Sequence, residues 1–500
     1  MMAALPRRDR VVLVTAMVLS TMPLWLVQTP PLTDLLGHMG RYHLQLSLDH
    51  SPELQRHWQL HWMLIGNLGI DLIMQVLGRL FGVERGAWLV AIAIPPLMIW
   101  GMVRLQNAYH RAVPPTIVAA FPFVLAYTYQ VGLVNFWLAV ALAFHASASV
   151  IGSPERWAKP VLLALSALAL WITHIFGWAI FCGIVATDRL FEREDEPFWR
   201  RFADLWPLAA PILVMLYQNY GEHDSAKTLG WFEWQHKRRA FWGILRSQDR
   251  LLDQWSLIAC LFPAALALVM RKAFRLARRP MLAAVGLGIC AALLPYQLFG
   301  SAFADARLFP VVLMLVAIAV VPRPRAPFWA TFVLPGLLFG LFAVRVAVDT
   351  MAFRAYDADF QRQLQLVDKV PKGSRIAYFV RFRCDREWAR TRLEHLDGLA
   401  IVRRDAFTNG QWEIPGAETV SPLAAKGTWA NSDPSQMVRL IRCRDDQMVS
   451  RLTTLIGRLP RDRFDYVWVM DFAPEELPLY PGLEPLYATD KSLLYRINRP

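Results

Sequence analysis

The sequence predicts a mainly α-helical, polytopic transmembrane bundle of about 11 spans, followed by a C-terminal soluble α/β domain. The first observation is composition: 55% of the 500 residues are hydrophobic and 19% are charged. The second is that long apolar runs recur from residue 11 to residue 348. A soluble core cannot absorb so many such runs, whereas about 20 apolar residues cross a bilayer as one helix. The third is a change of composition after residue 349, where charges become frequent and apolar runs short.

The first span is expected over residues 11–27. Arg7, Arg8 and Arg10 precede it, as they would in a signal peptide. The apolar stretch is longer than a typical signal-peptide core, and no small-x-small cleavage site follows it. We therefore expect an uncleaved first span with the N-terminus in the cytoplasm.

Ten further apolar segments are expected to cross the membrane. They are 87–103, 115–131, 132–150, 158–174, 175–190, 205–220, 251–270, 281–298, 308–321 and 328–348. The orientation depends on one more candidate, 62–81. If it does not span, the basic clusters at 189–201 and 271–279 are cytoplasmic, as the positive-inside rule requires. This count places the C-terminal domain outside the cytoplasm.

The residues of segment 62–81 agree with a helix that does not cross. Asn67, Asp71, Gln75 and Arg79 recur at every fourth position and form one polar stripe. Such a helix lies at the membrane interface or against the bundle. The alternative is a spanning helix whose polar stripe faces inward.

The chain therefore divides into a transmembrane domain, 1–349, with a first outer loop at 28–86, and an extracytoplasmic domain, 350–500. In the second domain we expect strands at 374–380, 398–404, 465–471 and 492–497, and helices at 386–396 and 434–457. Alternating strands and helices favour an α/β fold. Cys384 and Cys443 both fall there, and a disulfide between them is left open.

Several function classes are disfavoured. The net charge of +13 is typical of cytoplasmic loops and headgroup contacts in a polytopic protein, so no nucleic-acid binding is expected. The chain has no GxSxG elbow, no P-loop and no GxGxxG after a strand, so a nucleotide-driven pump is not expected. His57 and His61 lie one helical turn apart, but without an HExxH-type base. A divalent metal ion is left open.

Polar residues gather at the outer ends of the expected spans. Four separate outer turns contribute the candidates Asp34, His38, Arg41, Asn135, His174, Asp305 and Arg307. Ionisable groups at the membrane boundary are costly to desolvate, so their clustering indicates a functional site.

The order of these parts resembles the GT-C superfamily of polytopic glycosyltransferases. The resemblance rests on the cytoplasmic N-terminus, the first span, and a long outer loop that opens with the acidic segment TPPLTDLLGHMGRYH, followed by about ten spans and an outer domain. It implies transfer of a sugar from a polyprenyl-phosphate donor to an envelope glycan, lipid or protein acceptor. It further implies a multi-pass protein of the bacterial inner membrane, in contact with membrane lipids, that works on the outer face.

The resemblance implies a catalytic base or metal ligand at the acidic residue of the first loop, which by position is Asp34. Many GT-C members carry a paired acidic motif there, whereas Asp34 is followed by two leucines. His38 is expected to position the acceptor or steady Asp34, and Asn135 and His174 to line the same cavity. The acceptor hydroxyl needs such a base within hydrogen-bond reach.

The donor phosphate is expected to bind Arg41 and Arg307, because a planar guanidinium binds phosphate oxygens in pairs and stays charged. Asp305 is expected to hold Arg307 in place. Two other classes remain: a transporter or flippase of lipid-linked envelope components, and a non-catalytic envelope assembly protein. The absence of internal repeats disfavours transport, and the missing acidic pair favours the assembly protein. The loop 405–433, with FTNGQWEIPG, suits carbohydrate or peptide contact, although an ordinary surface loop explains it more simply.

Overall fold

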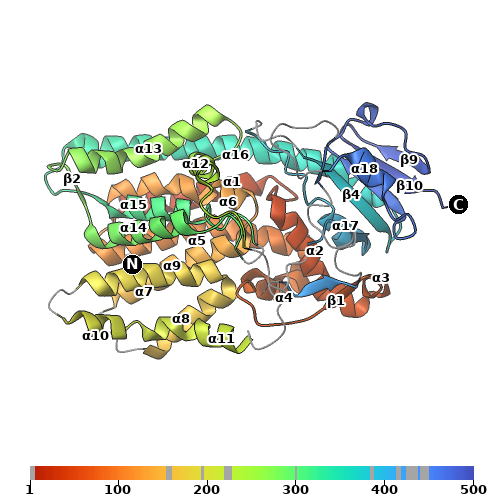
Figure 1. Ribbon diagram of the computed structural model, residues 1–500. Coiled ribbons are helices and arrows are strands. Elements are labelled where there is room, and N and C mark those ends of the chain that lie inside the picture. The colour runs from red at the N-terminus through yellow and green to blue at the C-terminus, as the bar shows by residue number, and fades with distance from the viewer. Residues whose placement is uncertain are drawn as a thin grey trace.

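The protein is mainly helical, with a bundle at one end and a mixed sheet at the other (Figure 1). This computed structural model describes residues 6–153, 160–192, 196–218, 228–298, 301–382, 388–412, 418–423, 437–439 and 450–499. Cys384 and Cys443 lie outside these ranges.

The bundle contains every apolar segment that the sequence singled out. Its elements are α1 (Arg7–Trp25), α5 (Val83–His110), η3 (Pro115–Leu125), α6 (Tyr127–Gln130), α7 (Val134–Gly152), α8 (Pro160–Thr173), α9 (Ile175–Glu192), α10 (Phe198–Ala203), η5 (Trp206–Ala209), α11 (Ala210–Gln218), α12 (Trp234–Trp242), α13 (Arg250–Val269), β2 (Phe274–Leu276), α14 (Arg278–Leu293), α15 (Leu308–Ala319), β3 (Val320–Pro322), η6 (Trp329–Val333) and α16 (Leu334–Leu364). Among the described residues, four helices are long and apolar enough to cross a membrane: Val83–His110, Val134–Gly152, Arg250–Val269 and Trp329–Lys369.

The other apolar segments are shorter or interrupted. The expected span 115–131 is a 3₁₀ segment, η3, followed by the short helix α6. Pro114, Pro115 and Pro122 explain this, because proline lacks the N–H that an α-helix needs. The segments 160–173 and 308–319 are apolar helices of less than spanning length.

The segment 62–81 folds as a short amphipathic helix, α4 (Gly69–Phe81). Its 13 residues measure about 20 Å, against a hydrocarbon core of about 30 Å. Asp71 is buried on the bundle side, while Leu72, Val76 and Leu80 are exposed on the other. A helix of this length is too short to cross the hydrocarbon core, and it packs against the bundle with Asp71 inward, while its position relative to the membrane stays a prediction.

The loop 28–86 and the C-terminal part form the second half of the molecule. The loop elements are α2 (Thr33–Ser47), η2 (Leu48–His50), α3 (Pro52–Gln55), β1 (Trp58–Leu60) and α4. The C-terminal elements are η7 (Val367–Lys369), β4 (Arg375–Arg381), α17 (Gly398–Arg404), β5 (Phe407–Thr408), β6 (Val420–Pro422), β7 (Met437–Val438), α18 (Leu452–Gly457), β8 (Tyr466–Met470), η9 (Pro474–Glu476), β9 (Leu483–Ala488) and β10 (Ser492–Ile497).

The main sheet has the order β5-β4-β8-β10-β9, with β7 following β5 along the edge of β4. Strand β4 runs parallel to β5, β7 and β8, and β10 runs antiparallel to both β8 and β9. Three of the four expected strands, those at 374–380, 465–471 and 492–497, are therefore present as β4, β8 and β10.

The remaining expectations for this part were wrong in their described residues. Segment 398–404 is helix α17, because Gly398 lets it pack on the backbone of α2: a Cβ there would lie 2.3 Å from the Leu36 carbonyl oxygen. Residues 388–396 are not helical. Of the described residues in the expected helix 434–457, 437–438 form β7 and 452–457 are helical.

The two halves share elements and a core. Helix α16 continues through residue 349, the expected domain boundary, to Leu364. Strand β1 of the first loop pairs with β6 of the C-terminal part. One hydrophobic cluster combines Leu54 and Trp58 of the loop with Phe379 and Val469 of the sheet. The loop 28–86 is thus part of the C-terminal fold.

A hydrogen-bonded carboxylate reinforces this junction. Asp405, which ends α17 with a left-handed φ of 48°, bonds to His43 of α2 (2.7 Å) and to Lys372 (2.7 Å). Ser51 also donates to it (3.0 Å). Burial opposes its ionisation, but the three donors together hold the pKa of Asp405 well below its usual range.

Candidate functional site

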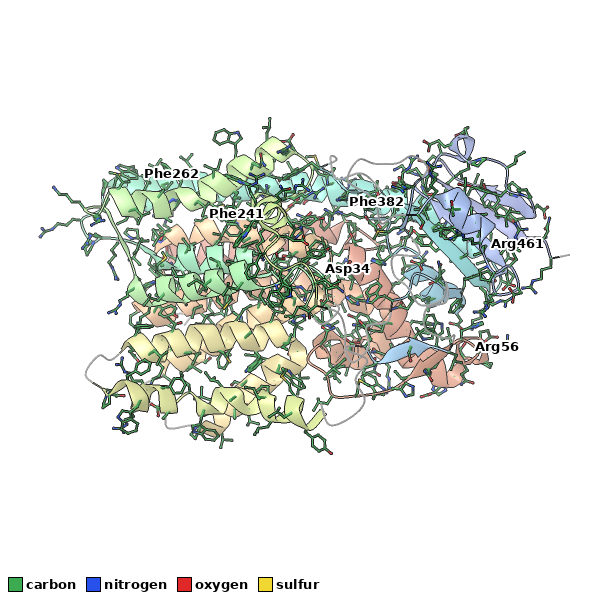
Figure 2. All side chains as sticks on the ribbon, viewed as in Figure 1. Asp34, Arg56, Phe241, Phe262, Phe382 and Arg461 are labelled. Carbon is green, nitrogen blue, oxygen red and sulfur yellow. The ribbon has the colours of Figure 1, made fainter. Side chains whose placement is uncertain are left out.

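Asp34 lies in the first turn of α2, where the loop 28–86 leaves the bundle (Figure 2). Its backbone N–H donates to the Val131 carbonyl (2.7 Å). Gly132, with a φ of +100°, permits this contact, because a Cβ there would lie 2.7 Å from the Leu35 nitrogen. The helix is capped at Leu32 without a side-chain bond, so the Asp34 carboxylate is not used as an N-cap.

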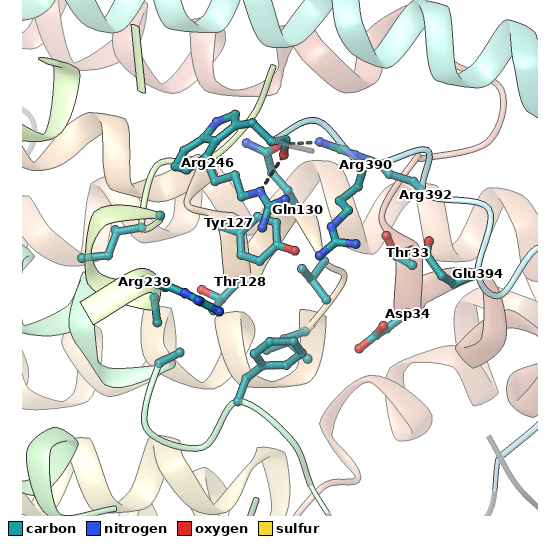
Figure 3. Close-up of a pocket in the computed structure, with 18 of the residues that line it drawn as sticks. Thr33, Asp34, Tyr127, Thr128, Gln130, Arg239, Arg246, Arg390, Arg392 and Glu394 are labelled. Carbon is teal, nitrogen blue, oxygen red and sulfur yellow. Dashed lines mark hydrogen bonds between the residues drawn. The ribbon is translucent and has the colours of Figure 1, made fainter. Parts of the chain in front are cut away.

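The Asp34 side chain is one-quarter exposed and faces a cavity of about 950 Å³ between the bundle and the C-terminal part (Figure 3). Six arginines contribute to its lining: Arg239, Arg246, Arg250, Arg381, Arg390 and Arg392. The lining carboxylates are fewer: Asp34, Glu233 and Glu394. The cavity therefore carries an excess of positive charge, which favours an anionic ligand.

Among the lining arginines, Arg392 bonds to the chain just before α2. It is buried, with a left-handed φ of 61°. It donates to the Pro31 carbonyl (2.8 Å) and to Gln130, and its guanidinium lies over the rings of Phe353 (4.9 Å) and Tyr356 (4.6 Å). These contacts fix a permanent charge beside the loop that positions Asp34.

Two histidines and a tryptophan surround Asp34 on the side of the sheet. The Nε2 of His395 lies 3.9 Å from the Asp34 carboxylate. The ring of Trp412 contacts both His395 (centroids 4.5 Å apart) and His38 (5.2 Å). Trp412 reaches this position because Gly37 leaves room for it: a Cβ on Gly37 would lie 2.1 Å from the indole.

The His38 imidazole is neutral at pH 7. Burial, with the nearby charges of Arg41, His395 and Arg307, lowers the pKa of His38 well below its usual value. Its buried Nδ1 has no hydrogen-bond partner among the described residues. His38 thus lies one helical turn after Asp34 and packs against Trp412, and it does not line the cavity.

Arg307 is also close to this group. It is buried, and no carboxylate lies within 4 Å of it in the described part of the chain. Its guanidinium donates to Ser301 (2.6 Å) and the Ala302 carbonyl (3.0 Å), and it contacts His174 Nε2 (3.1 Å). Burial lowers its pKa to about 10, and the charge of Asp34 opposes that shift. Arg307 is therefore a buried cation, and Asp34 is the carboxylate whose charge acts on its pKa.

Asp305 does not hold Arg307 in place, as the sequence had suggested. Its carboxylate bonds to Lys237 of α12 (2.9 Å) and to the Ala306 N–H (2.8 Å). The same lysine donates to the Ala291 and Leu294 carbonyls. Asp305 thus fixes α12 against the ends of α14 and α15, and it does not line the cavity.

Arg41 and Asn135 lie in a separate buried cluster around Asp71. The Nε of Arg41 is 2.9 Å from Asp71, and its Nη1 pairs with Glu418. Asn135 accepts from the Ile70 N–H (2.7 Å) and donates to Asn67 (3.1 Å) at the start of α4. Neither residue lines the cavity, and the charge of Arg41 is already balanced by two carboxylates.

Among the described residues, no three His, Cys, Asp or Glu side chains come together in a ligand-like group. Asp34 has no second carboxylate next to it in sequence. The divalent metal ion that the sequence left open stays a prediction.

Sequence reasoning missed Arg392 and His395, which line the cavity, and Trp412, which packs against His38 and His395. Their sequence separation from Asp34 is large, and they were assigned to a helix or to a surface loop. The sequence did contain one signal for the basic character of the cavity. The basic residues in 237–250, including Lys237, Arg238 and Arg239, fall on the expected outer side, against the positive-inside rule.

Comparison with known proteins gives a likeness of fold. No model of a known protein family matches the chain, and no curated protein matches it. Two solved structures do: the crystal structures of ArnT from Cupriavidus metallidurans bound to undecaprenyl phosphate (12% identity) and in the apo state (10%). Each alignment covers 98% of this chain and 97% of ArnT, with a TM-score of 0.48.

Proposed function

We propose that the protein is a membrane glycosyltransferase that moves a sugar from a polyprenyl-phosphate-linked donor to an envelope acceptor. The observation that carries the proposal is the placement of the Asp34 carboxylate in an arginine-rich cavity of about 950 Å³. A phosphate-linked sugar needs positive charge for the phosphate and a base for the acceptor. This cavity supplies both.

Asp34 acts as the base. It takes the proton of the acceptor hydroxyl while the acceptor oxygen attacks the anomeric carbon of the donor sugar. The bond from that carbon to the phosphate oxygen breaks, and the lipid phosphate leaves with the bonding electrons. His395, 3.9 Å from Asp34, and His38, one helical turn after it, help to hold the carboxylate.

Arginines stabilise the leaving phosphate. Arg392, a lining residue, is held by two hydrogen bonds and two aromatic rings, so its charge needs no reorganisation as the phosphate departs. Arg307 follows the lining residue Ala306 in sequence and does not itself line the cavity, so it adds an unbalanced positive charge from the protein interior. Arg41 is better explained as part of the structural cluster with Asp71.

The setting proposed for this reaction is the outer face of a bacterial inner membrane, with the N-terminus in the cytoplasm. The acceptor is an envelope glycan, lipid or protein. Four long apolar helices and the many apolar side chains exposed on the bundle, such as Leu213 and Val269, support a membrane location.

The test is transfer of labelled sugar from a polyprenyl-phosphate donor by the full-length protein in vesicles. Asp34→Asn keeps the shape of the side chain but removes the base, so turnover is expected to fall by about 10²-fold or more. Donor binding should stay near that of the wild type. Asp49→Asn, an exposed position on the same loop, is the matched control and should remain active. A fully active Asp34→Asn protein would move the assignment to a transporter or an assembly protein.

A further inference from the structure

A second, smaller groove opens beside the cavity, between α12 and α13. Its volume is about 420 Å³. It is lined by Arg238, Arg239, Trp242, Arg250, Gln254 and Trp388. Three of these residues, Arg239, Arg250 and Trp388, also line the main cavity, so the two spaces adjoin.

The charges in this groove are not balanced by the protein. In the described part of the chain, no carboxylate lies within 4 Å of Arg238, Arg239 or Arg250, and no acidic residue lines the groove. The neighbouring Lys237 points the other way and is neutralised by Asp305. Three guanidinium groups around one small space repel one another unless an anion joins them.

The groove is firmly built on one side. The indole N–H of Trp388 donates to the buried carboxylate of Asp253 (2.6 Å), which fixes the ring. The guanidinium of Arg250 lies 5.6 Å from the centroid of that ring. The aromatic wall therefore holds Arg250 in place for a ligand.

The outward face of α12 has the pattern of a helix at the depth of lipid headgroups. Trp234, Arg238 and Trp242 follow one another at four-residue spacing, and the two tryptophans are 59% and 40% exposed. Lys237 and Phe241 lie on the inward face. Exposed tryptophan alternating with arginine is typical of interfacial helices, because the indole ring lies at the depth of the headgroups and the guanidinium binds lipid phosphate.

An apolar track leads away from the groove along α13. Leu251, Trp255, Ile258 and Phe262 are all exposed and, by their spacing, share one face of the helix with Gln254. Phe262 is labelled on α13 in Figure 2. Such a stripe on a membrane helix offers contact to acyl or prenyl chains. The headgroup charge and the tail surface are thus continuous.

We propose that this groove binds the phosphate headgroup of a membrane lipid, with the lipid tails along the exposed face of α13. The phosphate oxygens bridge Arg238, Arg239 and Arg250, since guanidinium groups bind phosphate in pairs of hydrogen bonds. The site adjoins the Asp34 cavity and shares Arg239, Arg250 and Trp388 with it, but it does not depend on the transfer reaction. A phospholipid of the bilayer and a polyprenyl phosphate offer the same chemistry.

Native mass spectrometry of the full-length protein in detergent tests this site. The protein is supplied with phosphatidylcholine alone, or with added phosphatidylglycerol, undecaprenyl phosphate or inorganic phosphate. With added anionic lipid, the wild type is expected to retain one lipid molecule more than it retains with phosphatidylcholine alone. Comparison of the phosphatidylglycerol and undecaprenyl phosphate samples identifies which lipid it is. Arg238→Gln should lower that retention by about tenfold, the usual weight of one charge-assisted hydrogen bond.

The matched control is Arg85→Gln, an exposed arginine in the first turn of α5. It should leave lipid retention unchanged, and both variants should melt at the wild-type temperature because both side chains are exposed. Equal loss in the two variants, no loss in Arg238→Gln, or equal competition by inorganic phosphate would each overturn the proposal.

Discussion

Gly37 is the position where one added carbon should disturb the site most directly. In Gly37→Ala the new Cβ would lie 2.1 Å from Cζ3 and 2.5 Å from Cη2 of Trp412. The indole has to move by about 1.3 Å to reach an ordinary contact of 3.4 Å. That ring lies against His38 and His395, so its displacement passes to the side chains around Asp34.

The expected magnitude has two opposing parts. Alanine stabilises a helix by about 0.5–1 kcal/mol relative to glycine. Overpacking a buried contact costs about 1–3 kcal/mol. We therefore expect Gly37→Ala to destabilise the protein by about 1–2 kcal/mol, and to lower sugar transfer by about tenfold or more, because small misplacements near reacting groups are costly.

Thermal unfolding of the solubilised protein and the transfer assay measure both effects. Gly340→Ala in α16 is the control, because a Cβ there meets nothing within 4 Å, and it should leave activity unchanged. The double variant Gly37→Ala/Trp412→Phe should recover most of the lost stability. If Gly37→Ala is as stable and as active as the wild type, the packing of Trp412 on α2 does not position the site.

Three further changes separate structural from functional roles. Arg41→Gln leaves two buried carboxylates without their cation, so a loss of about 3–5 kcal/mol is expected in thermal unfolding. Arg307→Lys replaces the guanidinium that bonds Ser301 and Ala302, and should weaken donor binding in a lipid-binding titration without unfolding the protein. Asp405→Asn keeps the left-handed backbone but loses the ion pairs, at a cost of about 1–3 kcal/mol. Folding lowers the pKa of Asp405, so its ionised form stabilises the protein fully above pH ~4. In acid unfolding, the difference in unfolding free energy between the wild type and Asp405→Asn should shrink below that pH.

Sequence periodicity predicted the parts of the fold that local pattern decides. The apolar runs, the amphipathic α4 and the strands β4, β8 and β10 all follow from residue spacing. Segment 398–404 was assigned to a strand because Ile401 and Val402 favour one, but packing of Gly398 against α2 selects a helix. That contact joins residues more than 360 positions apart, which no local pattern contains.

The candidate site was predicted only in part for the same reason. Asp34 and His38 could be found because they open the first loop after a span. Arg307 could be placed near a span end, but its partners could not, and Asp305 turned out to bond Lys237. His395 and Trp412 reach Asp34 only through the packing of the C-terminal part on α2.

The shared core sets an order on biogenesis. Leu54 and Trp58 bury their side chains against Phe379 and Val469, which the ribosome adds much later. The roughly 320 residues between these groups take about 15–60 s to synthesise at ~5–20 residues per second. During that time the first loop exposes an apolar surface to water, because its packing partners have not yet been made. At this stage the protein is most prone to aggregation and proteolysis, and a chaperone that covers the surface would protect it.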